Sequence, residues 1–593
     1  MVFAVRFTIA RCATLFAGLA ERLDTTTLAV LVLLPGIAEL ALYLAARRWL
    51  LPALPGRLQV AAATTANVAY AFLIVTDLRV LSAFHRPLDL SLYREGTAAM
   101  PVATMLSLFR WFDWSIIGVA LLSAIVRRSV PVPQSVPAKL PLAVVAATCI
   151  VGAFTLPGAL PGYTAISAVL RIPAVAALHF AEKNTTTLVA SKAAHFDPLP
   201  AELPRETYAG KTADKNTPNI LFIVLESTGA RYVFDSSLTL TGKGVPMPFL
   251  QKLKGESVYL ARHYATANSS PRALFSLFTG LYPEPSDKFF SLKKGLRIKT
   301  WNRYLPEHQG LVVTPCVTEW YFPNGLFRNN GLREIIGKSQ LNFRESRTEP
   351  ADARNEIQTA DYFAARLKTL EQPFFSVYIS FAPHYPYHDY GPEWRVTAGR
   401  SRLDRYVDNL RLLDEQLKKF FSALEQRGSL ANTIVVLVGD HGEAFKQHPG
   451  NYIHSLHSYE ENLAVPALIW YPARLRPREI TFPTSHVDLG PTVLDLLEIA
   501  HNPRDFQGVS ALRNYRRPHI FAYGNEGTIT VYTQQLRKTQ RLRDTSCRMF
   551  DLKTDSDEKL PLACDAGDSA LDSASQYAAG QMVLLQRLQS RNP

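Results

Sequence analysis

Long apolar stretches fill roughly the first 160 residues of the chain, and the remainder alternates short apolar runs with polar loops. A helix needs about 20 apolar residues to cross the roughly 30 Å hydrocarbon core of a bilayer. Four stretches come near that length: 27–46, 61–80, a segment ending at Val126, and 140–160. A fifth candidate begins near Phe7 but carries Arg11, and its alternatives are a signal-peptide segment or an interfacial helix. The pattern predicts an N-terminal, multi-span α-helical membrane domain with four or five spans.

Basic residues gather in two of the loops between these spans. Arg47, Arg48 and Arg57 lie in one loop, and Arg127, Arg128 and Lys139 lie in another. Because loops rich in Lys and Arg stay in the cytoplasm, the chain after Leu160 is expected outside, for four spans or five. Three regions follow: a transmembrane domain at 1–160, a linker with interfacial helices at 161–215, and an extracytoplasmic globular domain at 216–593.

The globular region contains five unbroken apolar runs bounded by turn signals, at 220–225, 311–313, 374–379, 433–438 and 467–470. Continuous hydrophobicity is typical of strands buried on both faces. The stretch 403–426 has apolar residues at helical spacing, and Gly428 follows it. This alternation predicts a doubly wound α/β sheet, whose ligands gather at the carboxyl ends of the strands.

The formal charge of +13 is compatible with a nucleic-acid partner. No basic helix, aromatic stacking platform or zinc-finger spacing accompanies this charge, so we expect no nucleic-acid partner. An anionic membrane surface or a phosphorylated substrate explains the charge more simply.

Polar residues with metal-binding side chains follow two of the predicted strands. Glu226 ends the first run, and Asp440 and His441 follow the run at 433–438. Oxygen and nitrogen ligands of this kind suit Zn²⁺ or Mn²⁺ better than Mg²⁺. An Asp-His pair alone is more often a loop turn with a surface histidine.

A third candidate lies between these runs, where Ser270 precedes Pro271 and a stretch ending at Gly280. Pro suits the first helical position and Gly suits the stop, so Ser270 is predicted as the N-cap. A hydroxyl there faces the positive end of a helix, beside backbone N–H groups that can hold a phosphoryl oxygen. Most such serines are only caps.

Seven stretches in order resemble the sulfatase-like branch of the alkaline-phosphatase superfamily, in particular phosphoethanolamine transferases and lipoteichoic acid synthases. They are 219–227, 270–283, 384–387, 439–443, 459–466, 485–492 and 550–552. The resemblance implies a sulfatase-like catalytic domain with one metal ion, Zn²⁺ or alternatively Mn²⁺. It implies that Glu226, Asp440 and His441 bind the ion and that Ser270 is both nucleophile and ligand.

Two features depart from the family pattern. The transferases most often use threonine as nucleophile, although cellulose phosphoethanolamine transferases resemble this chain in using serine. Sulfatases convert a Cys or Ser to formylglycine when Pro follows two positions later and Arg four positions later. Neither Ser269 nor Ser270 begins that pattern. Hydrolysis of sulfate esters is therefore disfavoured.

The resemblance also implies substrate contacts. His384 follows the run at 374–379, and it and His454 resemble two substrate-contacting histidines that hold a phosphate oxygen or protonate a leaving alkoxide. His457 is a further candidate. Trp320 and Asn324 are candidates for the acceptor or head-group pocket, although core packing suits the tryptophan better.

Together these features predict a transferase of the bacterial inner membrane with a periplasmic catalytic domain. It would move a phosphoethanolamine or phosphoglycerol head group from a membrane phospholipid, through Ser270, to an envelope glycan, lipid A or a glycolipid. The alternatives are a phosphodiesterase or sulfatase-like hydrolase, with water as acceptor, and a non-catalytic binding module.

The cysteines test the predicted location. Cys547 and Cys564 flank a short polar stretch expected outside the cytoplasm, where disulfides persist, so we predict that they pair. The alternative is two unpaired thiols on a flexible tail. Cys316 follows a buried run and is expected to remain a thiol.

Overall fold

A computed structural model describes residues 209–581, apart from gaps at 236–243, 285–297, 319–325, 342–354, 565–569 and a few shorter ones. These residues belong to one compact unit of the chain, residues 188–593. The membrane domain predicted at 1–160 and most of the linker predicted at 161–215 lie outside the described residues. Among those that are described, no helix is long and apolar enough to span a bilayer.

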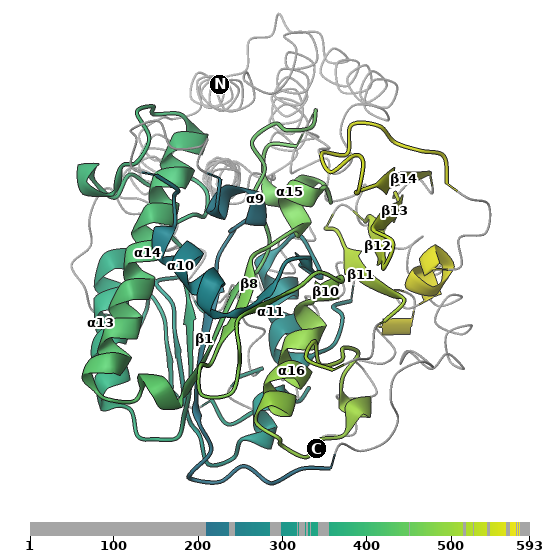
Figure 1. Ribbon diagram of the computed structural model, residues 1–593. Coiled ribbons are helices and arrows are strands. Elements are labelled where there is room, and N and C mark those ends of the chain that lie inside the picture. The colour runs from purple at the N-terminus through teal and green to yellow at the C-terminus, as the bar shows by residue number, and fades with distance from the viewer. Residues whose placement is uncertain are drawn as a thin grey trace, which may run out of the picture. The chain divides into compact units, whose positions relative to one another are not determined.

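An eight-stranded sheet forms the centre of this unit (Figure 1). Its strands are β1 Asn219–Leu225, β2 Val258–Leu260, β4 Gln309–Val313, β5 Glu334–Ile336, β6 Phe374–Ile379, β7 Thr433–Gly439, β8 Ala467–Trp470 and β9 Arg478–Ile480. They lie in the order β5-β4-β6-β1-β7-β8-β2-β9. The five apolar runs predicted as strands are β1, β4, β6, β7 and β8, which confirms each of them to within two residues at either end.

The sheet is mixed, so the doubly wound α/β pattern expected from the sequence is confirmed only in part. Strands β5, β4, β6, β1 and β7 are parallel, but β8 runs antiparallel to both β7 and β2. The chain between β7 and β8 returns to the sheet from the edge at which it left, and an antiparallel neighbour needs no crossover helix. Continuous hydrophobicity reports burial on both faces of a strand but not the strand's direction.

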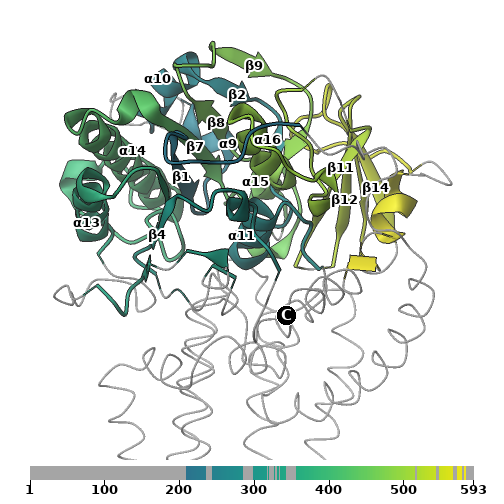
Figure 2. The ribbon, with the colours of Figure 1, turned by 90° about the horizontal axis from the view of Figure 1, so that it is seen from below.

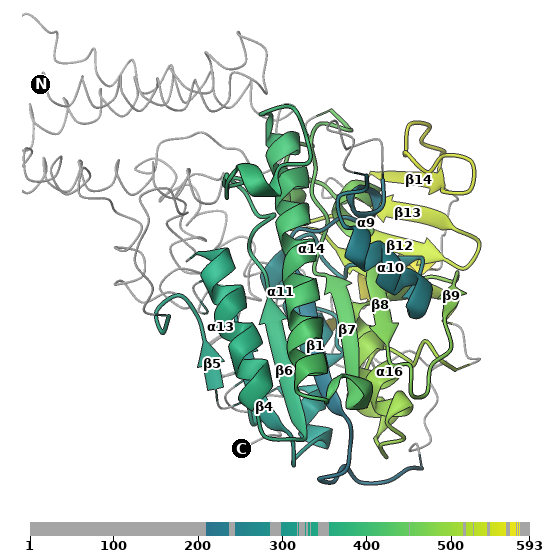
Figure 3. The same cartoon turned by 60° about the vertical axis from the view of Figure 1, so that its left-hand side comes forward.

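Helices cover both faces of the sheet. They are α9 Ala230–Val233, α10 Pro248–Glu256, α11 Ser270–Thr279, α13 Glu356–Thr369, α14 Arg402–Gln426, α15 Glu460–Leu463 and α16 Leu489–Leu496. Alternate β1 residues face opposite sides, so Leu221 and Ile223 pack with α10, α13 and α14, whereas Phe222 and Val224 pack with α11 and α16. Figure 3 shows the first group in front of the sheet. The helix predicted at 403–426 is α14, which begins with a capping box formed by Ser401 and Asp404.

A second sheet of four antiparallel strands lies beyond α16, on the far side from α13 and α14 (Figure 2). Its strands are β11 His519–Tyr523, β12 Ile529–Thr533, β13 Arg537–Arg541 and β14 Cys547–Asp551. Two short strands, β3 His263–Tyr264 and β10 Thr484–Ser485, form a separate pair. The sequence pattern did not reveal this sheet.

The disulfide predicted between Cys547 and Cys564 is present, with Cα atoms 6.0 Å apart. Cys547 begins β14, so the bridge joins a strand to the loop that follows it rather than two points of a flexible tail. Leu562 in that loop pairs with Met549 by two backbone hydrogen bonds. Cys316 takes no part in the bridge and is buried, as expected.

Candidate active site and metal centre

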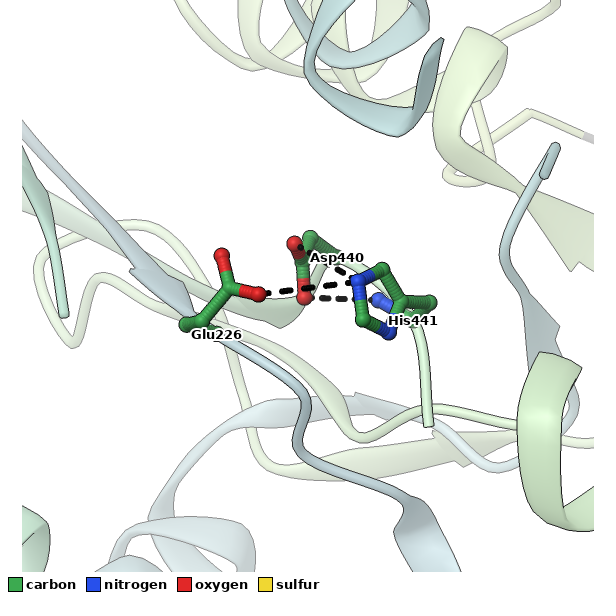
Figure 4. Close-up of side chains that lie close together, drawn as sticks. All are labelled: Glu226, Asp440 and His441. Atoms are coloured by element: carbon green, nitrogen blue, oxygen red, sulfur yellow. Dashed lines mark hydrogen bonds and ion pairs between the residues drawn. The ribbon is translucent and has the colours of Figure 1, made fainter. Parts of the chain in front are cut away.

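Two neighbouring strands bring the predicted metal ligands together. β1 and β7 are parallel and Leu225 lies opposite Gly439, so Glu226 and Asp440 leave the sheet at the same edge. Figure 4 shows Glu226, Asp440 and His441 pointing toward one another. One ligand atom from each lies within 4.8 Å of the other two, and all three residues are fully buried.

Asp440 is fixed through only one of its oxygens. Oδ1 accepts hydrogen bonds from the backbone N–H groups of Ser227 and His441, each at 2.8 Å. Oδ2 is buried, accepts no hydrogen bond and lies 3.4 Å from His441 Nε2. A buried carboxylate oxygen without a donor is costly unless a cation balances it.

His441 presents a ring nitrogen to the same point. Its Nδ1 lies 2.9 Å from the carbonyl oxygen of Gly442, which can only accept, so this geometry assigns the proton to Nδ1 and leaves Nε2 bare. Nε2 lies 3.6 Å from Glu226 Oε1. Burial lowers the pKa of His441, which favours the neutral ring that a metal needs. Two carboxylates and a bare imidazole nitrogen are a donor set that fits Zn²⁺ or Mn²⁺.

Close backbone packing shapes this edge of the sheet. Gly442 donates its N–H to the carbonyl of Asn462, and a Cβ on Gly442 would lie 2.0 Å from the carbonyl oxygen of Glu461. Ser227 adopts a positive φ of 53°, which non-glycine residues seldom do. In that conformation its N–H reaches Asp440, so the unusual turn contributes directly to the site.

Ser270 completes the cluster. Its Oγ donates a 2.9 Å hydrogen bond to Glu226 Oε1 and lies 3.0 Å from His441 Nε2. The N-cap prediction is wrong by one residue, because Ser269 is the N-cap, Ser270 is the first helical residue and neither hydroxyl caps α11. The helix ends as predicted at Gly280, which has a φ of 70°. The Ser270 hydroxyl therefore does not cap the helix and faces the predicted metal ligands.

Asn525, which sequence reasoning missed, supports the turn that carries Ser270. It lies in the loop between β11 and β12, and its Oδ1 accepts hydrogen bonds from Ser269 Oγ, at 3.0 Å, and from Arg272. Its backbone N–H donates to Asn268 at 2.8 Å. The second sheet thus contributes directly to the candidate site. No local pattern around Asn525 marks this role.

His384 and His454, the two histidines predicted to contact substrate, lie beside the cluster. The rings of His454 and His441 stack with centroids 4.2 Å apart, and the His384 ring is 5.6 Å from that of His454. Burial lowers the pKa of both His384 and His454 to about 4, so both rings are neutral near pH 7. His454 Nδ1 lies 3.0 Å from Glu443 Oε2. Glu443 is a second residue without an assigned role in the sequence analysis, although it belongs to the 439–443 motif.

The remaining candidates are placed differently. The backbone carbonyl of His457 accepts a hydrogen bond from Asn268, and its ring lies 5.7 Å from the ring of Tyr459. Trp320 and Asn324 lie outside the described residues. The structure therefore gathers Glu226, Ser270, Asp440, His441, His384 and His454 at one edge of the sheet.

Comparison with known families now identifies the domain. A model described as Sulfatase matches residues 218–499, a range that contains all of the clustered residues. This part of the chain belongs to the sulfatase family. Within the alkaline-phosphatase superfamily, this sulfatase-family domain is distantly related to lipoteichoic acid synthases.

Individual relatives support the same placement. The chain is 24% identical over 367 residues to lipoteichoic acid synthase-like YvgJ of Bacillus subtilis, which covers 58% of each protein. Lipoteichoic acid synthase 2 of B. subtilis is 24% identical over 315 residues, covering 50% of this chain and 47% of that relative. The chain thus spans about half the length of the curated relatives it matches.

A solved structure supports the fold of the sulfatase-family domain. A crystal structure of an alkaline phosphatase superfamily protein from Vibrio parahaemolyticus has a TM-score of 0.52 and 20% identity, covering 69% of this chain and 96% of that one. At this identity, the likeness shows the fold alone.

Proposed function

We propose that the protein is a metal-dependent transferase. It moves a phosphoethanolamine or phosphoglycerol head group from a membrane phospholipid, through a covalent adduct on Ser270, to an envelope glycan, lipid A or a glycolipid. The observation that carries this proposal is the position of Ser270 Oγ, within 3.0 Å of both a ligand carboxylate and a ligand imidazole. The kinship with lipoteichoic acid synthases supports a phospholipid donor.

Glu226, Ser270, Asp440 and His441 are the residues that would hold one ion, Zn²⁺ or alternatively Mn²⁺. When bound, such an ion lowers the pKa of a serine hydroxyl and offsets charge on phosphoryl oxygens. All four of these residues are buried, so the surrounding protein limits the access of water to the site.

In the first step, Ser270 Oγ forms a bond to phosphorus, and the bond from phosphorus to the glycerol oxygen breaks, so diacylglycerol leaves. Ser270 loses one proton and the leaving alkoxide gains one. His384 and His454 are neutral and present Nε2, so either ring can carry that proton. In the second step, the acceptor hydroxyl attacks phosphorus and the bond to Ser270 breaks, with the proton passing in the opposite direction.

The proposal includes the location inferred from the sequence: a multi-pass protein of the bacterial inner membrane, with 1–160 in the bilayer, 161–215 as linker and 216–593 in the periplasm. Spans at the N-terminus would keep the sulfatase-family domain near its lipid donor. The Cys547–Cys564 disulfide supports an extracytoplasmic domain, because such bonds persist in oxidising compartments.

The test is mass spectrometry of the Ser270 peptide after the full-length protein is incubated with vesicles of phosphatidylethanolamine and phosphatidylglycerol. We expect a phosphoethanolamine or phosphoglycerol adduct on Ser270 and none in Ser270→Ala. An adduct on any other residue would overturn the assignment of the nucleophile. Release of the free head group into water, with no transfer to added glycolipid, would favour the phosphodiesterase alternative.

A further inference from the structure

The three histidines at the site are held in the same way. Each places Nδ1 against a hydrogen-bond acceptor: the Gly442 carbonyl for His441 at 2.9 Å, the Tyr385 carbonyl for His384 at 2.6 Å, and Glu443 for His454 at 3.0 Å. In every case Nε2 is then the nitrogen left to face the reaction. Two of the acceptors are backbone atoms, which no substitution removes. The third is a side chain.

Glu443 is itself rigidly placed. Its side chain is fully buried, and Oε1 accepts a 2.9 Å hydrogen bond from the N–H of Ala444. Oε2 is the atom that meets His454 Nδ1. Both oxygens therefore have a contact, and these two contacts fix the orientation of the carboxylate. The ring of His454 is held from its face as well, because it stacks on His441 at an interplanar angle of 28°.

We propose that Glu443 is a positioning residue that fixes the ring of His454 with Nδ1 protonated and Nε2 directed at the phosphoryl group. Glu443 touches no reacting atom and acts through His454. The consequence for the reaction rests on the proposed function, whereas the tautomer of His454 does not.

A second buried pair, between α15 and the loop of His448, separates this role from simple burial of a carboxylate. Glu461 lies 2.8 Å from Nδ1 of His448, and both residues are buried. There, however, Nε2 of His448 is used as well, because it lies 3.0 Å from the backbone carbonyl of Asp557. His448 thus connects α15 to the loop that contains Asp557, whereas the Glu443–His454 pair leaves Nε2 of His454 available.

A double-mutant cycle on the full-length, zinc-loaded protein tests the inference. Activity is the rate of diacylglycerol release from vesicles of phosphatidylethanolamine and phosphatidylglycerol. Glu443→Ala should lower kcat by about 10- to 100-fold, as loss of such a supporting partner typically does. In a His454→Ala background, the same substitution should lower kcat by less than about twofold, because its target is gone. The control, Glu461→Ala, should have the same effect in both backgrounds.

Two results would overturn the proposal. One is an equal loss from Glu443→Ala with and without His454, which would indicate a general structural role. The other is loss of bound zinc in Glu443→Ala, which would mean that the residue acts through His441.

Solid-state ¹⁵N NMR of the full-length protein in bilayers at pH 8 provides a readout independent of turnover. The His454 signal is the one that His454→Ala removes. We expect a protonated Nδ1 and a bare Nε2 in the wild type, and a mixture of the two tautomers in Glu443→Ala. A bare Nδ1 in the wild type would refute the assignment. If vesicle turnover is absent but this spectrum is as expected, the proposed function fails and the positioning role stands.

Discussion

Two buried clusters in the domain contain the same residue types, one histidine and two acidic residues, and differ in what surrounds them. The first is Glu226, Asp440 and His441, and the second is His448, Glu461 and Glu558. In each cluster, one ligand atom per residue lies within 4.8 Å of the other two. By residue type and spacing alone, both could bind a metal ion.

The second cluster supplies its own hydrogen-bond donors and positive charge. Both ring nitrogens of His448 face acceptors, and Asn451 donates a 2.7 Å hydrogen bond to Glu461. Lys538, whose side chain is fully buried, lies 2.8 Å from Glu558. In the first cluster, Asp440 Oδ2 receives no hydrogen bond and His441 Nε2 is bare. Glu461 Oε2 in the second cluster also receives no hydrogen bond. The bare ring nitrogen of His441 and the buried ammonium group of Lys538 beside Glu558, rather than residue type, therefore distinguish the two clusters.

The largest expected difference concerns Ser270, the proposed nucleophile, which lies beside the first cluster. Ser270→Ala should lower transfer by about 10,000-fold or more, since losing a covalent nucleophile removes the reaction path rather than one contact. Folding should be nearly unchanged, because the Ser270 hydroxyl does not cap α11. Ser269→Ala is the control and should keep most of the activity. Turnover retained by Ser270→Ala but lost in Ser269→Ala would move the nucleophile by one residue.

Metal content provides the next contrast. Elemental analysis of the purified protein should find one zinc or manganese ion per chain. His441→Ala should reduce the bound metal at least about 10-fold, because it removes a direct ligand. Glu461→Ala, in the second cluster, should leave the content at one. Two ions per chain, with one lost in Glu461→Ala, would show that both clusters bind metal. That result would contradict the distinction drawn between them.

The lysine of the second cluster should matter for stability rather than for metal. Lys538→Met leaves Glu558 buried without its cation, and breaking a buried pair from one side typically costs about 3–5 kcal/mol. Lys553→Met is the control, since Lys553 is exposed, and should change stability by less than about 0.5 kcal/mol. Thermal or denaturant unfolding measures both. Equal stability of the two variants would show that the buried charge is balanced in another way.

A third buried acidic group, Glu356, differs from both clusters because its burial favours the protonated carboxyl. It gives the smallest of the expected effects. It accepts hydrogen bonds from Tyr378 Oη at 2.6 Å and from the N–H of Phe381 at 2.7 Å, and burial raises its pKa to about 7. The folded state therefore binds a proton that the unfolded state releases above its ordinary pKa of 4.5. This contribution to stability is complete below that pKa and is lost as the pH rises through 7.

Glu356→Gln mimics the protonated group, so its stability should lack this component of the pH dependence. The decrease in the free energy of unfolding between pH 5 and pH 8 should be smaller in the variant than in the wild type, by about 3 kcal/mol at most. Denaturant midpoints at several pH values measure it. Parallel pH profiles for the two proteins would contradict a raised pKa at Glu356.

The central sheet could be predicted because its strands are fully apolar, and a polar residue directly after such a run must lie at a sheet edge. That reasoning predicted Glu226, Asp440 and His441 at one edge of the sheet, where the structure has them. The second sheet could not be found in this way. β13 reads Arg-Lys-Thr-Gln-Arg, yet Lys538 and Gln540 are fully buried, because Glu460, Glu558 and the backbone of Ser458 satisfy them. A polar strand of this kind resembles a loop until its distant partners are known.

The same limit applies within the site. The proposed roles of Ser270 and His441 follow from strand ends, a helix start and the family motifs. The roles of Glu443 and Asn525 depend on contacts with residues far along the chain or across a loop. Neither residue type nor spacing carries that information, so only the folded arrangement reveals it.

The contact between Asn525 and the turn that carries Ser270 also has a consequence for the order of events during biosynthesis. Ser269 and Asn525 are 256 positions apart in the chain. At a synthesis rate of about 5–20 residues per second, the serine turn emerges from the ribosome roughly 13–50 seconds before its supporting asparagine. Throughout that interval the nascent chain already contains Glu226 and Ser270 but lacks the loop whose Asn525 holds the neighbouring Ser269. The candidate catalytic centre is thus completed late in synthesis, although Ser270, its proposed nucleophile, is among the first residues of the domain to be made.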